Sequence, residues 1–438
     1  MKKKKVLSLI LTAALSVSLM AGCAKTNNAT NSGNKTEGST TEVVKVTFVN
    51  SKGEIQTQLE EAAVAFTAAN PNIDVEVIPC PDGTSPFEKI SAMYASGNAP
   101  TLAMMDPNDI PKFKDKFADL SSEKWVADTL EGNLDAVTID GVVKAFPLTI
   151  EGYGLIYNKS VLDAAGVDPT TINTTDSLKA AFAKIDASGV APMILSPMDW
   201  SLGAHYLTLA YNQQDKDLAK AEELIAGLKD GSADLSNNAV FNGYMDTFDV
   251  LKEANIDNAD ALAGTYDRAA EVLGKGEVGF WFMGNWAWPQ IKEFNESNSD
   301  FGFIPVPVSN DAADYGNTQI TVAPSKFIGL DVEQNSQEQQ DAAKAFLNWL
   351  VYDEAGQDIL VNKANIIPAF KNITLEAQDP LAKSIKSYMS EGKTLRSIAT
   401  LPGDHWAQVG AAMQKYLVGQ SDRATLAEEI KAYWGTVK

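Results

Sequence analysis

Tryptophan, carboxylate, amide, lysine and histidine side chains recur in the short loops of this sequence, between segments of apolar residues. The flat face of an indole packs well on the apolar face of a ring, while carboxylates, amides and ammonium groups make directed hydrogen bonds to hydroxyls. These residue types therefore favour recognition of a neutral polyhydroxylated molecule.

Trp286 follows the most aromatic stretch of the chain. Alternating side chains at 278–283 predict a buried strand, in which Phe280 and Phe282 belong to the core. Gly284 ends that strand, and a helix is expected to begin directly after it. Because strand-to-helix junctions of α/β sheets open onto ligand clefts, we predict that Trp286 is an exposed stacking platform.

Glu151 interrupts the apolar run 144–159, whose residue types predict an extended strand. A carboxylate in such a run is costly unless it is hydrogen-bonded or faces a wet cleft, so we predict a binding role for it. Lys52 and Glu54 lie in the loop expected at the carboxyl end of the first strand, an edge where parallel sheets bind ligands. A solvated ion pair on that loop is an equally good interpretation of these two residues.

Three other loops carry polar or aromatic candidates. A turn at 196–200 sets an acid beside an indole, the loop at 106–109 follows a short strand, and the segment 401–406 combines acid, imidazole and indole. The candidates in these loops are Asn108, Asp199, Trp200, Asp404, His405 and Trp406.

Several catalytic chemistries lack their residues. With two histidines in the sequence, a histidine-based zinc cluster is excluded, and no metal site is predicted. No phosphate-binding glycine loop or GxSxG nucleophile motif occurs, and no cofactor is predicted. Residue counts leave open a serine–histidine–aspartate triad, and also a carboxylate pair for glycoside hydrolysis drawn from Glu151, Asp199 and Asp404.

The elements that would position these residues follow an α/β pattern. Strand, helix and strand periods succeed one another at 44–48, 55–66 and 73–77, which predicts a βαβ unit and hence a parallel sheet. A body of this length, 43–438, exceeds one ordinary core and favours two lobes. Further helices are expected at 87–96, 176–188, 219–229, 341–353 and 407–417.

Residues 1–22 have the form of an export signal, because four lysines precede an apolar run that is too short to span a membrane comfortably. Small residues then lead into Cys23, which resembles the lipobox of bacterial lipoproteins, with Met20 in place of the more usual leucine. Cleavage before Cys23 and lipidation of its sulfur are expected. Residues 23–42 are polar beyond the cysteine and predict a flexible tether.

The formal net charge is −21, and loss of the four leader lysines takes it to −25. This charge is unfavourable for nucleic acid or for an anionic lipid face, so neither is a predicted partner. Membrane attachment is expected through the lipid alone. Cys80 is the only other cysteine, so the processed chain cannot form an internal disulfide.

Three segments together resemble one family: 273–288 (LGKGEVGFWFMGNWAW), 144–159 (KAFPLTIEGYGLIYNK) and 344–370 (KAFLNWLVYDEAGQDILVNKANIIPAF). They are similar to the carbohydrate-binding lipoproteins of bacterial ABC importers, of maltodextrin-binding type, in the raffinose and multiple-sugar branch. This resemblance implies an α/β, two-lobe periplasmic-binding-protein-like fold with three interlobe crossings and a ligand cleft between the lobes. The candidate crossings are 144–159, 301–308 and 365–370.

The same resemblance predicts how the chain divides between the lobes. Lobe 1 is expected at 43–147 and 308–355, and lobe 2 at 148–307 and 356–438. The two lobes are expected to close on the ligand as hinged bodies.

Residue roles also follow from the resemblance. It implies that Glu151 is the cleft carboxylate, that Trp286 is a stacking tryptophan and that Trp406 is a second aromatic platform, and it places Trp200 in an aromatic loop. The other residues that resemble polar contacts of the raffinose and multiple-sugar branch are Lys52, Glu54, Asn108, Asp404 and His405.

Met105 stands where maltodextrin binders carry an aromatic residue, which disfavours a long malto-oligosaccharide. We therefore predict a monomeric substrate-binding lipoprotein on the outer face of the cell membrane. It would capture a short α-galactoside or isomalto-type sugar for an ABC permease, and it would not be an enzyme. The alternatives are a secreted glycoside hydrolase, which would release products from oligosaccharides, and a non-sugar surface-binding lipoprotein, which no sugar would stabilise.

Replacement of Cys23 by serine should release the protein into the medium, because no other part of the sequence is expected to hold it in a bilayer. Fractionation of cells and medium followed by immunoblotting measures the outcome. Cys80→Ala is the matched control and should stay in the membrane fraction. Membrane retention of the Cys23→Ser protein would show that the anchor lies elsewhere.

Overall fold

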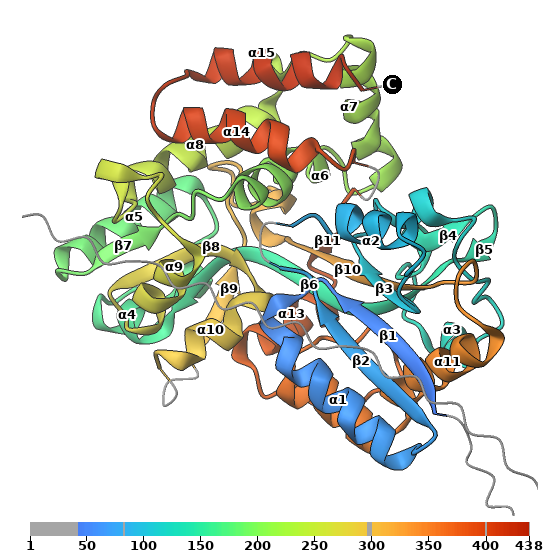
Figure 1. The fold of residues 1–438 in the computed structure, drawn as a ribbon. Coiled ribbons are helices and arrows are strands. Elements are labelled where there is room, and N and C mark those ends of the chain that lie inside the picture. Colours follow the sequence, from blue (N-terminus) through green and yellow to red (C-terminus); the bar gives the residue numbers. More distant parts are fainter. Residues whose placement is uncertain (1–42, 82–83, 296–299, 399–400, 438) are drawn as a thin grey trace, which may run out of the picture. The chain divides into compact units, whose positions relative to one another are not determined.

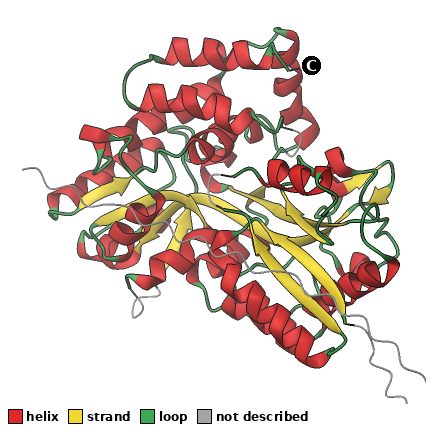
Figure 2. Ribbon diagram, viewed as in Figure 1, coloured by secondary structure: helices red, strands yellow, loops and turns green. Residues whose placement is uncertain are grey.

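The computed structural model describes residues 43–81, 84–295, 300–398 and 401–437, which belong to the unit Glu42–Lys438 of the chain (Figure 1). The predicted export signal, Cys23 and the tether lie outside the described residues. Figure 2 shows the strands gathered in a central sheet with helices on both of its faces.

The described chain begins with the predicted βαβ unit. β1 (Val44–Asn50) and β2 (Ile73–Pro79) pair in parallel along their whole length, and α1 (Gln56–Ala69) connects them. Apolar residues of α1 recur at helical spacing, so one stripe of the helix, which includes Leu59 and Phe66, is buried. The loop after β1 therefore lies at the carboxyl edge of the sheet, as predicted.

One large mixed sheet and a small hairpin contain the strands of the described residues. The hydrogen-bonded order of the sheet is β2-β1-β3-β10-β6-β8-β7, with β11 beside β10 and β9 beside β6. The other strands are β3 (Leu102–Met105), β6 (Ala145–Asn158), β7 (Ala191–Ile194), β8 (Val278–Gly284), β9 (Phe301–Ile304), β10 (Ile320–Leu330) and β11 (Thr394–Leu395), with the hairpin β4 (Thr138–Ile139) and β5 (Val142–Val143).

Two long antiparallel strands, β6 and β10, join the two ends of this sheet. β10 pairs with β3 through its last four residues, and with β6 from Thr321 to Gly329. From Tyr153 onward, β6 pairs with β8 and β9 instead of lying at an edge. The predicted crossing at 144–159 is confirmed as β6.

The second predicted crossing, 301–308, is wrong in its position. β9 ends at Ile304 and pairs with the last four residues of β6, because Pro305 and Pro307 have no N–H group to donate to a ladder. β10 occupies the crossing position instead. It accommodates Pro324 at a shift in its register with β6, which is where a sheet tolerates proline.

The third predicted crossing, 365–370, is an extended segment that lies beside β6. The N–H of Ile150 donates to the carbonyl of Ile367 at 2.8 Å. A few residues further on, the N–H of Leu130 donates to the carbonyl of Ala369 at 2.8 Å. The segment is thus held to β6 next to Glu151.

The predicted helices are confirmed to within a few residues of their expected ends. Phe280 and Phe282 of β8 are fully buried, as expected for core residues. The helices after α1 are α2 (Pro86–Ala95), α3 (Lys124–Asp128), α4 (Lys159–Ala164), α5 (Thr175–Ala187), α6 (Leu207–Asn212), α7 (Leu218–Asp230), α8 (Ala239–Ala254), α9 (Tyr266–Gly274), α10 (Trp288–Glu293), α11 (Gln337–Tyr352), α12 (Glu354–Asp358), α13 (Pro380–Ser390), α14 (His405–Leu417) and α15 (Arg423–Trp434), with π-helical turns η5 (Ser201–Tyr206) and η10 (Ile359–Lys363).

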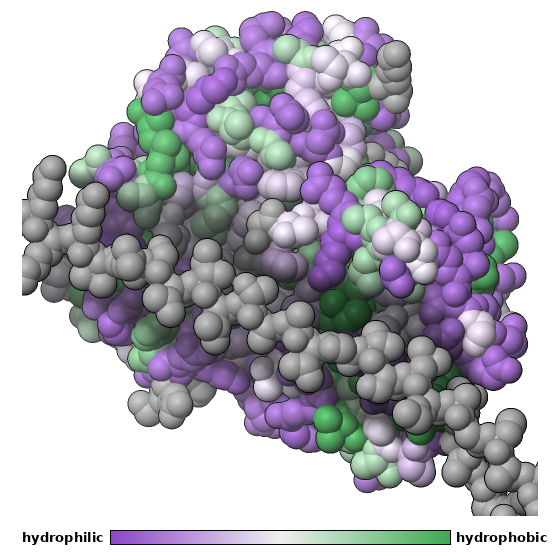
Figure 3. All heavy atoms as spheres, in the orientation of Figure 1, coloured by the Kyte–Doolittle hydropathy of each residue, from purple (hydrophilic) through white to green (hydrophobic). Residues whose placement is uncertain are grey.

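The face drawn in Figure 3 is mostly hydrophilic where the residues are described, with small apolar areas between. Across the described ranges, no helix has both the length and the apolar character that crossing a membrane requires.

Two glycines allow α14 to pack closely on the turn that contains η5. A Cβ atom on Gly203 would lie 2.4 Å from the carbonyl oxygen of Trp406, and one on Gly410 would lie 2.3 Å from the carbonyl oxygen of Asp199. Any larger residue at either glycine must therefore push α14 away from this turn.

Gly410→Ala should lower the free energy of unfolding by about 1–3 kcal/mol, because the new methyl group meets backbone atoms that no side-chain rotation can move. Urea unfolding measures the change. Gly435→Ala is the matched control, since a Cβ there would meet no atom closer than 3.5 Å. Equal stability of the wild type and the Gly410→Ala protein would contradict the close packing of α14.

Candidate functional site

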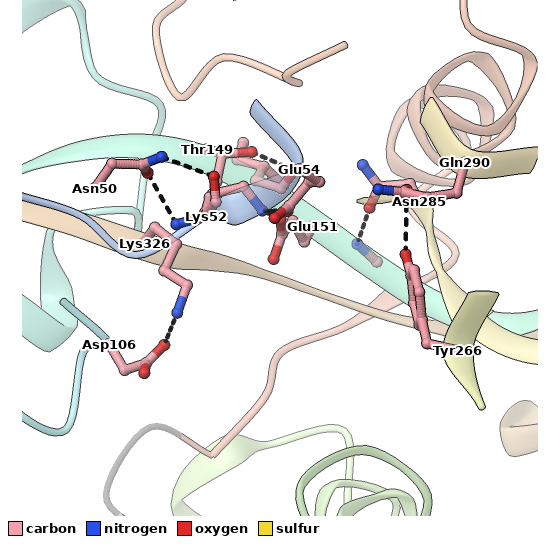
Figure 4. A network of polar contacts seen from close by, with 12 residues as sticks. Asn50, Lys52, Glu54, Asp106, Thr149, Glu151, Tyr266, Asn285, Gln290 and Lys326 are labelled. Atoms are coloured by element: carbon pink, nitrogen blue, oxygen red, sulfur yellow. Dashed lines mark hydrogen bonds and ion pairs between the residues drawn. The ribbon is translucent and has the colours of Figure 1, made fainter. Parts of the chain in front are cut away.

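Lys52 and Glu151 form the centre of the polar network in Figure 4. Asn50 fixes the loop after β1, because its side chain accepts the N–H of Lys52 and donates to the Lys52 carbonyl, both at 2.8 Å. Glu151 projects from the middle of β6. The Nζ of Lys52 lies 2.5 Å from Glu151 Oε1 and 2.6 Å from Glu54 Oε1, so one ammonium group serves two carboxylates.

Burial and neighbouring charges have opposite effects on the pKa values of Lys52 and Glu151. Burial lowers the pKa of Lys52, but the carboxylates of Glu151 and Glu54 raise it more, so it lies above its ordinary value of 10.5. Burial raises the pKa of Glu151, but the Lys52 ammonium holds it below its ordinary value of 4.5. Both groups are therefore charged at neutral pH, and each offsets the cost of burying the other.

A cavity of about 10 Å³ lies beside these ion pairs, which is room for about one water molecule. This space is too small to hold a larger solute by itself. The lining comes from the loop after β1, β6, the turn after β8 and the segment after η10, and it contains Lys52, Glu54, Ile55, Thr149, Glu151, Asn285, Trp286, Pro289, Ala364, Asn365 and Ile366.

Trp286 also belongs to an aromatic cluster, which we define as Tyr153, Trp200, His205, Tyr266 and Trp286. The His205 ring centre lies 4.8 Å from that of Tyr153 and 4.9 Å from that of Trp286. The Trp200 ring centre lies 6.2 Å from that of Tyr266 and 6.4 Å from that of Trp286. The structure thus brings the two candidate indoles together, and both remain partly exposed.

His205 is a member of this cluster that the sequence pattern does not mark. It lies in η5, a π-helical turn whose faces do not follow the α-helical period. Burial lowers the pKa of His205 to about 4, although the nearby Glu151 charge acts in the opposite direction. The imidazole is therefore neutral at pH 7 and offers an aromatic face together with one donor and one acceptor.

Asp199 shapes the turn that presents Trp200. Its carboxylate accepts the backbone N–H of Trp200 at 2.8 Å, and its carbonyl lies against Gly410 of α14. Asp199 does not line the cavity. Its contacts position the indole of the aromatic cluster.

A second ion pair joins β10 to the loop after β3, where the Nζ of Lys326 lies 2.5 Å from Asp106 Oδ1 (Figure 4). Asn108 lies in the same loop, and its buried Oδ1 has no hydrogen-bond partner in the described part of the chain. The run of polar residues at 106–109 is a signal that also includes Asp106. No comparable pattern marks Lys326, because Pro324 argues against a central strand at β10.

The C-terminal candidates do not line the cavity. His405 is 1% exposed, its Nε2 lies 3.4 Å from the Tyr211 hydroxyl, and burial lowers its pKa to about 4. Asp404 is exposed and accepts a hydrogen bond from the Tyr433 hydroxyl at 2.9 Å. Trp406 is 39% exposed on α14. Neighbouring residues at a helix start point in different directions, so adjacency in the sequence does not bring these side chains to one ligand.

The fold and the site together define a class of protein. Two long strands, β6 and β10, run through the mixed sheet, and the segment 365–370 pairs with β6. A polar and aromatic cavity lies beside these elements. This is the architecture of a two-lobe α/β binding protein. The chain belongs to the bacterial extracellular solute-binding proteins, the family whose model matches residues 61–387. The predicted family and fold class are confirmed, and solute binding outside the cell, not catalysis, is the role of this family.

Two of the known relatives that match the sequence illustrate the similarity. An uncharacterized ABC transporter extracellular-binding protein of Pyrococcus horikoshii is 25% identical over 407 residues, which cover 90% of this chain and 87% of the relative. The melibiose/raffinose/stachyose-binding protein MelE of Bacillus subtilis (strain 168) is 24% identical over 248 residues, which cover 51% of this chain and 55% of MelE.

Solved structures match over nearly the whole body of the chain. RafE in complex with raffinose has a TM-score of 0.74 at 19% identity and covers 90% of this chain and 99% of its own. A sugar transporter protein of Bacillus licheniformis in complex with stachyose has a TM-score of 0.71 at 19% identity and covers 90% of this chain and 100% of its own. At these identities the likeness establishes the two-lobe α/β fold.

Lys52→Met should lower the free energy of unfolding at pH 7 by about 3–5 kcal/mol, because it leaves the buried Glu151 carboxylate without its counter-ion. The pKa of Glu151 is depressed in the folded wild type, so the pair stabilises the fold above pH 4.5 and loses this effect as the pH falls below it. The difference between wild type and variant should therefore shrink at pH 4.

Urea unfolding at pH 7 and pH 4 measures both effects. Lys45→Met is the matched control, since Lys45 pairs with Glu76 at 2.6 Å on the surface, and it should change the stability little at either pH. A Lys52→Met protein as stable as the Lys45→Met protein at pH 7 would show that the buried pair is unimportant.

Proposed function

We propose that the protein captures a short oligosaccharide outside the cell and delivers it to the permease of an ABC importer. The observation that carries this proposal is the aromatic cluster beside the Lys52, Glu54 and Glu151 ion pairs. Partly exposed indoles suit the apolar faces of sugar rings, and the ion-paired groups beside them suit hydroxyls.

The names of similar proteins favour the same class of solute. MelE is described as binding melibiose, raffinose and stachyose, and two of the similar structures hold raffinose or stachyose. The Pyrococcus horikoshii relative is described as part of an ABC transporter. An α-galactoside is therefore the first candidate solute, and an isomalto-type sugar is the second.

Charge balance at the site favours a neutral solute. Glu151 and Glu54 share the Lys52 ammonium, and Asp106 pairs with Lys326, so each carboxylate has an ammonium neighbour while the network keeps one net negative charge, which disfavours an anionic solute. A charged solute would have to displace one of these pairs, whereas hydroxyls can hydrogen-bond to paired groups at lower cost.

Binding of a sugar requires the cavity to open and close, which we assign to hinged motion of two lobes. We place the crossings at β6, β10 and 365–370, so the expected lobe boundaries at 307/308 and 355/356 move into the second and third of these crossings. The mature protein would act as a monomer, held to the outer face of the membrane by lipid on Cys23.

A glycoside hydrolase is not supported as a second function. Of its three candidate carboxylates, Glu151 is paired with Lys52, whereas Asp199 and Asp404 do not line the cavity. Solute-binding family membership points the same way.

Calorimetric titration and thermal shift with melibiose, raffinose, stachyose and isomaltotriose test the proposal on the wild-type protein. We expect at least one of these sugars to bind and to raise the melting temperature, with no hydrolysis products after incubation. If none of them binds, the proposed solute class is wrong. If products appear, the chain is an enzyme.

Trp286→Ala should weaken binding of the best sugar about tenfold to a hundredfold. The indole would otherwise remove roughly 50–100 Å² of apolar sugar surface from water, worth roughly 1–3 kcal/mol. Phe294→Ala is the control, because this ring is exposed (38%) but does not line the cavity. Titration measures both variants, and normal melting with wild-type affinity of the Trp286→Ala protein would reject the stacking role of Trp286.

A further inference from the structure

Asn365 is a buried polar residue whose side-chain nitrogen has no hydrogen-bond partner in the described part of the chain. It is 8% exposed and lines the same cavity as Glu151 and Trp286. Its side-chain Nδ2 is shielded from solvent and makes no hydrogen bond to the described residues. A side-chain amide can donate two hydrogen bonds and accept two. Burying these atoms without partners costs free energy, so an unpaired buried amide in a native structure calls for a functional explanation.

The backbone around Asn365 is held in place from both sides. The N–H of Ala364 donates to Ile359 and the N–H of Ile366 donates to Leu360, at 2.8 and 2.9 Å, which fastens the segment to η10. Ile367 bridges to Ile150, the residue before Glu151. These bonds fix the position of the Asn365 backbone relative to β6.

Asn365 also has a left-handed backbone, with φ of 54°. Asp140 has the same φ, but it lies in the turn between β4 and β5, is exposed, and is followed by Gly141 at φ 80°. Hairpin geometry explains the conformation of Asp140. Asn365 follows the C-cap of η10, where a left-handed residue commonly ends a helix, so its conformation has a local cause and does not by itself require an amide, since glycine adopts it at lower cost.

We infer that the Asn365 amide donates hydrogen bonds to the bound solute. The inference rests on the proposed function, because it needs a solute that carries hydroxyl oxygens. Asn365 offers two N–H donors from the segment after η10, while Glu151 offers acceptor oxygens from β6. Together they would select a solute whose hydroxyls accept on one side and donate on the other. A water molecule would occupy the amide in the absence of solute.

Two variants separate a binding role from a backbone role. Asn365→Gly removes the amide and suits the left-handed backbone, and Asn365→Asp keeps the shape but replaces the donor by an acceptor. Both should lower the affinity for raffinose at least tenfold, while Asn365→Gly should melt at or above the wild-type temperature. Asp140→Gly is the matched control and should bind raffinose like the wild type. Wild-type affinity of the Asn365→Gly protein would overturn the inference.

A crystal structure of the solute-free protein gives a readout that does not depend on the identity of the sugar. We expect an ordered water on the Asn365 amide, within the cavity. A protein acceptor on that amide would overturn the inference. If the wild type binds none of the sugars, the proposed function fails, and the occupant of the amide still decides the role of Asn365.

Discussion

The contact between Lys52 and Glu151 is the constraint on which the site depends. A carboxylate in the middle of a buried strand is unfavourable, and an isolated ammonium in the loop after β1 would be equally so. Their pairing at 2.5 Å makes both positions possible. It also ties the first βαβ unit to β6, the strand that continues into the other half of the sheet. The cavity forms where these two elements meet, so its position follows from the ion pair.

The same pairing determines what the site can recognise. One ammonium shared by two carboxylates leaves lone pairs on Glu54 and Glu151 that still accept hydrogen bonds. The neutral His205 ring adds aromatic surface without adding charge. A site built in this way holds strong hydrogen-bonding groups that already have ion-pair partners and together carry one net negative charge, so it disfavours an anion and suits a polar solute that is uncharged.

The sequence predicts those parts of the fold in which apolar residues follow a single spacing, either alternating or helical. Alternation at 44–48 and helical spacing at 55–66 gave the βαβ unit, and the long apolar run around Glu151 gave β6. The sequence pattern does not indicate β10, because Pro324 lies inside it. A proline argues against a central strand unless the strand shifts its register with its neighbour. A shift of register depends on both paired strands, so a local pattern in one of them does not contain it.

The sequence marks a candidate residue where the signal is local. Glu151 and Trp286 stand out because each breaks the pattern of its own segment. His405 stands out for its neighbours in the sequence, but the first turn of α14 directs it inward, toward Tyr211. No local pattern marks Asn365, since its cavity exists only after η10, β6 and the turn after β8 are assembled.

The C-terminal helices act on the site through packing. Gly203 and Gly410 let the backbone of α14 lie against the turn that carries Trp200 and His205. That turn is π-helical, and a turn of this kind is retained only when tertiary contacts outweigh its poorer hydrogen bonding. The position of two members of the aromatic cluster therefore depends on a helix contact made outside the cavity. Residues near 404–406 resemble a binding motif in the sequence, whereas in the folded protein the backbone of this segment supports the aromatic surface that residues far from it in the sequence provide.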